Sequence, residues 1–226
     1  FSEGLADFER DFRRRRFWRL DKPKYDACFV MGVYGNPVRD GGKSPFEHAD
    51  EPMTPAACHF WIRRHALQAM REAGIPGYYR LTSRANRALE DGRTVCGNLN
   101  RREFSRRISA GRITTVCTFP HALFPWKASE SFALGRPILI EQAPLTETPA
   151  PFMPKAGEHF LEWLPDAGGF DAAAPLADPA SYRVLARIPL ARFRERAEWM
   201  RGVLADRNRL AEMGAACREV AARAGV

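Results

Sequence analysis

The chain has 226 residues, 45% of them hydrophobic, and its 35 basic and 27 acidic residues give a net charge of +8. This hydrophobic content supports a packed core in one large or two small domains. No segment reaches the ~18 uninterrupted apolar residues that span a bilayer, and the start, FSEGLADFERDFRRRRFWR, is too charged for a signal peptide. We therefore expect a cytoplasmic protein without a membrane span.

The five cysteines indicate neither a disulfide framework nor a zinc site. Their number is odd, they show no C-x-x-C spacing, and several lie in apolar surroundings. Such cysteines are typical of reduced core residues. The histidines also lack the spacing of metal ligands, so we expect no metal site.

The positive charge favours anionic partners and is densest in the run Arg13 to Arg19, which includes Phe17 and Trp18. One interpretation is a patch for nucleic acid or for the inner, anionic face of a membrane. The other is a solvated helix face whose aromatic residues pack on the domain. No RNA-recognition or zinc-finger motif accompanies the run, which disfavours nucleic acid. Residues 1–21 are expected to form an N-terminal helix or linker.

From Tyr25 onward, apolar strands alternate with amphipathic helices. Tyr25 to Val33 predicts a buried parallel strand that ends in a loop with Gly32 and Gly35, where a ligand can approach the backbone closely. Ala56 to Ala73 predicts a helix, and Tyr78 to Thr82 a second strand.

The second half of the chain continues this alternation. Asn100 followed by Glu103 resembles a capping box that begins a helix through Ile108, and Ile113 to Phe119 predicts a third strand. After a further helix and strand, two apolar stripes predict two closing helices, one from Leu190 to Leu204 and one from Leu210 to Ala224. The sequence therefore predicts an α/β fold, a mostly parallel sheet with helices on both faces and helices at the C-terminus.

The segment Pro125 to Gln142, PWKASESFALGRPILIEQ, has well-marked helix ends. Pro125 suits the first helical turn, and Gly135 suits the left-handed position after the last turn. The apolar run Pro137 to Ile140 then predicts a fourth strand. The start of this helix follows a predicted strand, so it is expected at the carboxyl edge of the sheet, where ligands of such sheets bind.

Three side chains near that helix start have the chemistry of a nucleotide-diphosphate site. The helix N-terminus attracts phosphate, and Lys127 adds a full positive charge. Ser129 can donate a hydrogen bond to phosphate. The two acceptor oxygens of Glu130 match the neighbouring hydroxyls of a ribose.

Lys127, Glu130, Ala133, Gly135 and Pro137 resemble the R/K-x-x-E-x-x-A-x-G-x-P segment of GT-B glycosyltransferases. These enzymes have two Rossmann domains and use nucleotide-sugar donors. The resemblance implies that residues 22–226, closing helices included, form the Rossmann-like domain that binds the donor. It implies metal-independent transfer, with a nucleotide-diphosphate sugar as donor substrate and no other cofactor.

One position departs from the resemblance. Many retaining members have a second glutamate eight positions before the one matched by Glu130, and here that position is Ala122. Retention and inversion therefore both stay open. The resemblance also implies an acceptor-binding domain in front of Phe1, and a glycan, lipid or protein as acceptor.

Arg63 and His121 complete the set of candidate binding residues, with Gly32 and Gly35. Arg63 is interpreted either as a contact to donor phosphate or acceptor, or as a surface residue of a basic protein. His121 is interpreted as a contact to phosphate or sugar, as a proton shuttle, or as a polar surface residue. Catalytic residues are not assigned. The alternatives are a non-catalytic nucleotide-binding module and a basic α/β domain that binds nucleic acid through Arg13 to Arg19.

Overall fold

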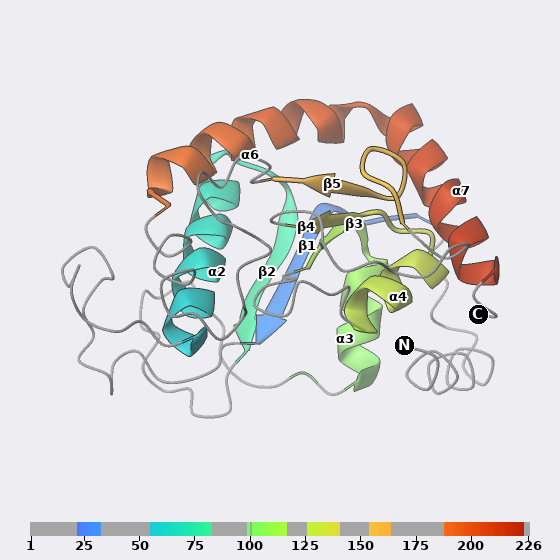
Figure 1. The fold of residues 1–226 in the computed structure, drawn as a ribbon, viewed down its shortest axis with the longest axis horizontal. Helices are drawn as coiled ribbons and strands as arrows, with labels where there is room; N and C mark the ends of the chain where they lie inside the picture. Colours follow the sequence, from blue (N-terminus) through green and yellow to red (C-terminus); the bar gives the residue numbers. More distant parts are fainter. Residues whose placement is uncertain are drawn as a thin grey trace.

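A computed structural model describes residues 22–32, 55–82, 99, 101–116, 126–140, 154–163 and 188–223. In these ranges, strands and helices alternate and two helices close the chain (Figure 1). The elements are β1 (Tyr25–Gly32), α2 (Pro55–Glu72), β2 (Gly77–Thr82), α3 (Arg101–Ser109), β3 (Gly111–Thr115), α4 (Trp126–Ala133), β4 (Ile138–Ile140), β5 (Phe160–Glu162), α6 (Leu190–Ala205) and α7 (Arg207–Arg223).

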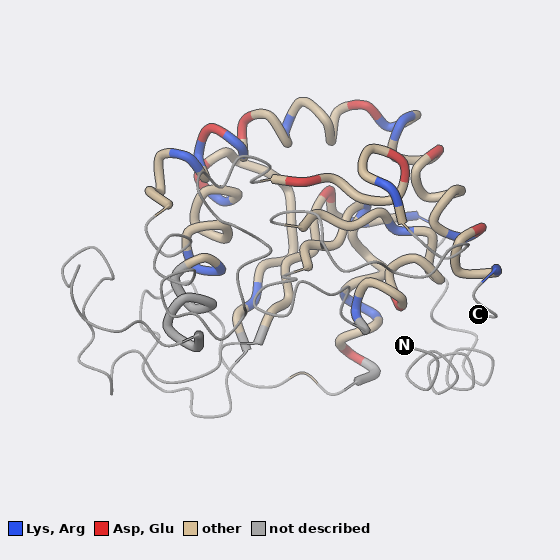
Figure 2. The backbone as a smooth tube through the Cα atoms, viewed as in Figure 1, with Lys and Arg blue, Asp and Glu red and all other residues tan. Residues whose placement is uncertain are grey.

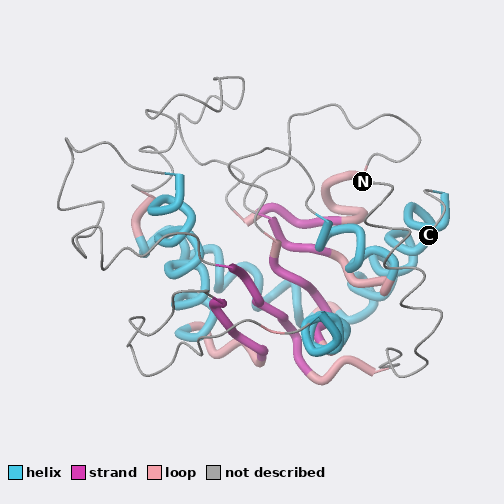
Figure 3. Tube along the Cα trace, turned by 90° about the horizontal axis from the view of Figure 1, so that it is seen from below, coloured by secondary structure: helices cyan, strands magenta, loops and turns pink. Residues whose placement is uncertain are grey.

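The strands of the described residues form one parallel sheet in the order β2-β1-β3-β4-β5. Strand β2 lies on one side of β1. The next strand in the chain, β3, lies on the other side of β1, and β4 and β5 follow beyond it. This is one of the common doubly wound strand orders. The direction in which successive strands are added to the sheet reverses between β1 and β3, although all strands run parallel. The predicted α/β fold, Rossmann-like with a parallel sheet, is confirmed. Figure 3 shows the strands side by side between the helices.

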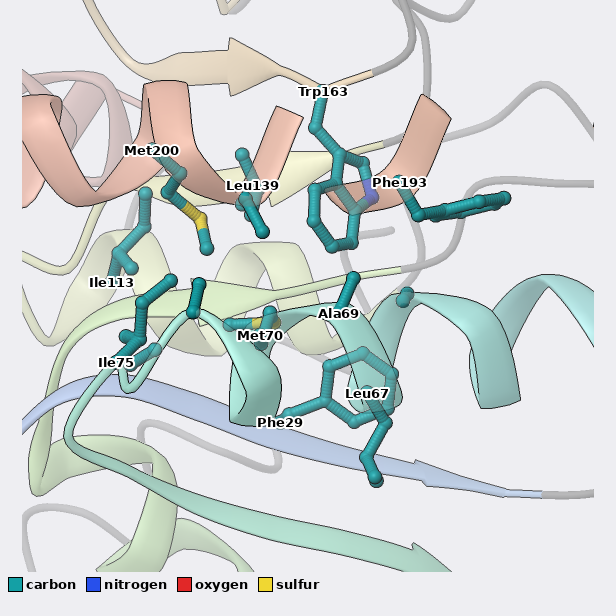
Figure 4. Close-up of a cluster of buried hydrophobic side chains, with 14 of the residues drawn as sticks. Phe29, Leu67, Ala69, Met70, Ile75, Ile113, Leu139, Trp163, Phe193 and Met200 are labelled. Carbon is teal, nitrogen blue, oxygen red and sulfur yellow. The ribbon is translucent and has the colours of Figure 1, made fainter. Parts of the chain in front are cut away.

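Helices α2 and α6 cover one face of the sheet. Alternate residues of β1, Ala27, Phe29 and Met31, belong to the core cluster on this face. Trp163 and Phe193 meet edge to face in the same cluster, with ring centroids 5.9 Å apart. Figure 4 shows this core, which includes Leu67, Ala69, Met70, Ile75, Ile113, Leu139 and Met200.

Helices α3 and α4 cover the other face. Cys28 and Val30, the intervening residues of β1, pack with Ile108 of α3. On the same face α4 inserts Ala128 and Phe132 among residues of β4. The helices on both faces exclude water from the strands, as expected for an all-parallel sheet.

Helix α7 contributes to the cores of both faces. Leu210 and Met213, in its first half, belong to the cluster with α2 and α6. Cys217 and Ala221, in its second half, belong to the cluster with α4. In Figure 1, α6 and α7 form an arch over β5, at the edge of the described sheet. The predicted closing helices are therefore confirmed as a structural cover.

Two glycines end helices as expected from their conformational freedom. Gly74, after α2, has φ 67°, and Gly135, after α4, has φ 65°. The left-handed region is costly for residues with a Cβ atom, so both helices stop where glycine permits the turn. The predicted helix stop at Gly135 is confirmed.

The sequence did not predict strand β5. It has only three residues, Phe160–Glu162, and follows a turn around Gly157, which has φ 78°. Its backbone pairs with β4 over its whole length. The guanidinium of Arg196 donates hydrogen bonds to the carbonyls of Glu162 and Trp163, at 2.9 and 2.8 Å, and so holds its carboxyl end against α6.

No helix among the described residues is both long and apolar enough to cross a membrane. The predicted N-terminal helix or linker, residues 1–21, lies outside the described residues.

Candidate functional site

The carboxyl ends of β1 and β3 and the start of α4 meet at one edge of the sheet. This is where the strand order reverses, and ligands of doubly wound sheets bind at such a reversal. Gly32 is the last residue of β1. The start of α4 lies at this edge, since the side chain of Lys127 reaches the end of β1.

Lys127 connects α4 to β1. Its ammonium donates a hydrogen bond to the carbonyl oxygen of Val30 at 2.5 Å, and its side chain is 8% exposed. Val30 lies beyond Cys28 and Thr114, the last pair of the β1–β3 ladder. Lys127 Nζ also lies 5.9 Å from the ring centroid of Phe104 on α3. The carbonyl and the ring face compensate part of the cost of burying the charge.

Glu130 and Ser129 lie on the same short helix and are also buried. Glu130 is 2% exposed and Ser129 is 4% exposed. Within the described ranges, the Ser129 hydroxyl has no hydrogen-bond partner. A helix turn that contains a lysine, a serine and a glutamate, all buried, is unusual, because charged residues are almost never fully buried without a specific reason.

Cys28 lies on the sheet face beneath α3 and α4. Burial raises the pKa of its thiol to about 12, although the positive charges of Lys127 and Arg107 act in the opposite direction. The thiol is free, buried and protonated at neutral pH, so it is no nucleophile. The predicted reduced core cysteines are confirmed for Cys28 and for Cys217.

Thr114 is a buried polar residue on the same face that the sequence interpretation did not single out. It pairs with Cys28 on one side and with Ile138 on the other. In the part of the chain that the structure describes, its hydroxyl has no hydrogen-bond partner. In the sequence, Thr114 is a hydroxyl-bearing residue within an apolar, β-branched run. Threonine is common in strands because of its β-propensity, so its presence there did not indicate a site.

Arg63 is buried in the middle of α2, with 7% of its surface exposed. The interpretation of Arg63 as a surface residue is therefore wrong. Since α2 and α4 cover opposite faces, Arg63 does not share a face with Lys127 and Glu130. Two further candidates, Gly35 and His121, lie outside the described residues.

Two histidines are core residues. His65 meets the ring of Phe193 edge to face, with centroids 5.6 Å apart, and burial lowers its pKa. His159 is buried too, and its Nδ1 accepts a hydrogen bond from the backbone N–H of Lys155 at 3.0 Å. Among the described residues, no group of three or more His, Cys, Asp or Glu side chains could hold an ion.

Comparison of the sequence with models of known protein families gives no match, and comparison with curated proteins gives none.

Proposed function

We propose that this chain is the donor-binding domain of a GT-B-like glycosyltransferase and that it binds a nucleotide-diphosphate sugar at the start of α4. The observation that carries the proposal is the position of Lys127 to Glu130 in the first turns of α4. This helix begins beside the end of β1, at the reversal of strand order, and its two ionisable residues are buried there. Buried ionisable side chains gather at functional sites more often than elsewhere.

Each residue has a distinct role in the proposal. The start of α4 binds the diphosphate through backbone N–H groups and the helix dipole. Lys127 places a positive charge close to the helix start, where its ammonium also donates a hydrogen bond to the Val30 carbonyl oxygen. Ser129 donates to phosphate, and Glu130 accepts hydrogen bonds from the ribose hydroxyls. Gly32 permits close approach of the ligand at the end of β1.

The chemistry that this arrangement favours is departure of a nucleoside diphosphate. The bond between the sugar carbon and the phosphate oxygen breaks, an acceptor oxygen bonds to that carbon, and the acceptor proton goes to a base that we do not assign. Negative charge grows on the leaving phosphate. A positive helix end and a fixed ammonium stabilise that charge without a metal ion. The proposal includes an acceptor and a domain that binds it, but it assigns no residue of this chain to either.

Calorimetric titration of the chain with UDP, GDP, ADP and their sugars tests the proposal. We expect one nucleotide series to bind. Glu130→Gln keeps the size of the side chain and removes its charge, so it should weaken binding about tenfold or more, the effect of losing a charged hydrogen bond. Glu158→Gln is the matched control, because the side chain of Glu158 is 49% exposed in a turn. If none of these nucleotides binds at millimolar concentration, the proposal fails.

The same titration separates the alternatives. A chain that binds nucleotide but transfers no sugar when supplied with a complete acceptor half is a non-catalytic module. A chain that binds only random DNA, with strong salt dependence that neutralising Arg13 to Arg16 abolishes, is the nucleic-acid binder instead. That basic run lies outside the described residues.

A further inference from the structure

The turn that precedes β5, residues 155–159, is closed by the ring of His159. The backbone N–H groups of Glu158 and His159 donate to the carbonyl oxygen of Lys155, at 3.3 and 2.9 Å. In return, the backbone N–H of Lys155 donates to Nδ1 of His159 at 3.0 Å. Gly157, with φ 78°, allows the chain to reverse between them. The two ends of the turn are therefore joined by hydrogen bonds in both directions.

His159 also joins the turn to the rest of the fold. Its side chain is 3% exposed, and its ring meets that of Phe132 on α4 edge to face, with centroids 6.4 Å apart. Its carbonyl oxygen accepts hydrogen bonds from the Cys217 thiol of α7 and from the backbone N–H of Ile138 at the start of β4, each at 3.4 Å. Figure 2 shows the acidic and basic positions of the turn, in red and blue, next to α7. One residue thus contacts α4, α7 and β4, and the contacts from α4 and β4 are uncharged.

The hydrogen bond from Lys155 requires a neutral His159 ring. A ring nitrogen that accepts a hydrogen bond carries no proton, so the proton of the neutral ring is on Nε2. A second proton has to go to Nδ1, where it faces an N–H group that is itself a donor. Protonation therefore removes this hydrogen bond and leaves two donors facing each other, which costs free energy in a place that water hardly reaches.

The charges around His159 come from the turn and from α7. Glu158 Oε1 lies 3.7 Å from Nε2, and its carboxylate favours the protonated ring. The charges of Lys155 and of Arg223, on α7, disfavour it. The Cys217 thiol is uncharged at neutral pH, because burial raises its pKa to about 12. Burial is the largest influence on His159, and it lowers the pKa of the ring below the ordinary 6.5.

We propose that His159 is a proton-operated latch: the neutral ring holds the 155–159 turn against α4 and α7, and protonation in mild acid releases the turn while the rest of the fold stays closed. The release is local because residues 155–158 are exposed and His159 is the buried residue of the turn, so opening exposes little apolar surface. The latch does not depend on the proposed function. Below about pH 6.5 the released ring binds a proton that the closed one does not, so the released fraction grows as the pH falls.

Hydrogen–deuterium exchange of the full chain tests the latch. Mass spectrometry follows the peptides that contain residues 155–161, β1 and α6 at pH 7.5 and 5.5, with labelling times scaled for the intrinsic pH dependence of amide exchange. We expect the protection of residues 155–161 to fall by up to about tenfold at the lower pH, and that of β1 and α6 to stay. Unchanged protection of the turn overturns the latch. An equal loss in β1 and α6 overturns it too, because that is global unfolding.

Non-titrating variants assign the effect to His159. The amide oxygen of His159→Asn can take the place of Nδ1 as acceptor, so its turn should stay protected at both pH values. His159→Phe keeps an aromatic ring but has no acceptor, so its turn should exchange faster than that of the parent, equally at both. His65→Gln is the matched control, because it removes the buried histidine of α2 and should leave the opening of the turn in acid unchanged.

The two His159 variants and the control give a clear decision. Opening of the turn in acid that persists in either folded His159 variant, or that His65→Gln abolishes, shows that His159 is not the latch. If one of the His159 variants does not fold, the other variant and the comparison of peptides within the parent still decide.

Discussion

Lys127 Nζ and the carbonyl oxygen of Val30 are 2.5 Å apart although 97 residues separate them in the chain. This hydrogen bond joins the start of α4 to the carboxyl end of β1, on either side of the reversal of strand order. Lys127, which we propose to bind a ligand's phosphate, therefore also connects two elements of the fold. Substitution of Lys127 should consequently affect stability as well as binding.

Replacing Lys127 with methionine tests the structural part of this role. The variant keeps most of the apolar stem but leaves the Val30 carbonyl without its donor. A buried hydrogen bond to a charged group contributes about 1.5–3 kcal/mol, and we expect the free energy of unfolding to fall by that amount in urea. Lys155→Met is the control, because its side chain is 71% exposed, and it should stay within about 0.5 kcal/mol of the parent. Equal stability of both variants would contradict a structural role for Lys127.

Gly135→Ala and Gly74→Ala separate backbone strain from crowding. Both glycines are left-handed, with φ 65° and 67°. A Cβ atom at Gly74 would meet nothing within 4 Å, so its cost is the backbone term of about 1–2 kcal/mol. A Cβ atom at Gly135 would also press on Arg218 and approach the Gly214 carbonyl oxygen to 3.1 Å. Urea unfolding should show the larger loss for Gly135→Ala.

Adding Arg218→Ala to Gly135→Ala should recover part of that loss, because the crowded guanidinium is then absent. Two glycine variants with the same loss, or no recovery in the double variant, would exclude close contact with Arg218 as the cause.

Cys28 should resist alkylation in the folded protein. Its thiol is completely buried, and burial raises its pKa to about 12. The thiolate is the reactive form, so iodoacetamide at pH 8 should leave the peptide that contains Cys28 unmodified until urea unfolds the chain. The Cys217 peptide should behave in the same way, since burial raises its pKa to about 12 as well. Mass spectrometry of tryptic peptides measures both, and rapid labelling of Cys28 under native conditions would show that its strand opens.

The buried histidines should make the protein less stable in mild acid. Burial is the largest cause that lowers the pKa of both His65 and His159 below the ordinary 6.5. Below that value the unfolded chain binds more protons than the folded one, so the free energy of unfolding falls as pH decreases toward the folded pKa values. Protonation of His159 Nδ1 would also remove the bond that it accepts from Lys155 N–H.

Urea unfolding between about pH 7.5 and 5.5 measures this slope. The double variant His65→Gln with His159→Gln should show a flatter dependence than the parent, whatever its stability at the upper pH. An unchanged slope would mean that other groups cause it.

Local signals in the sequence were sufficient for most elements of the described fold. Apolar runs predicted β1 to β4, and apolar stripes predicted α6 and α7. Gly135 predicted the end of α4. These features depend on the backbone conformation and the hydrophobic periodicity of a single segment, so the residues of that segment are enough to predict them. Strand β5 was missed because three residues carry too little periodicity, and pairing with β4 defines it.

The arrangement of the candidate site depends on contacts that no local signal contains. Arg63 and Arg64 look alike in the sequence, but Arg63 is buried and Arg64 is only half-buried, because α2 docks with one side on the sheet. The sequence predicted Lys127 and Glu130 as binding residues from their types and their position at a helix start. It could not predict that Lys127 bonds to Val30, or that His159 packs on Phe132, because strand order and helix docking bring distant segments into contact.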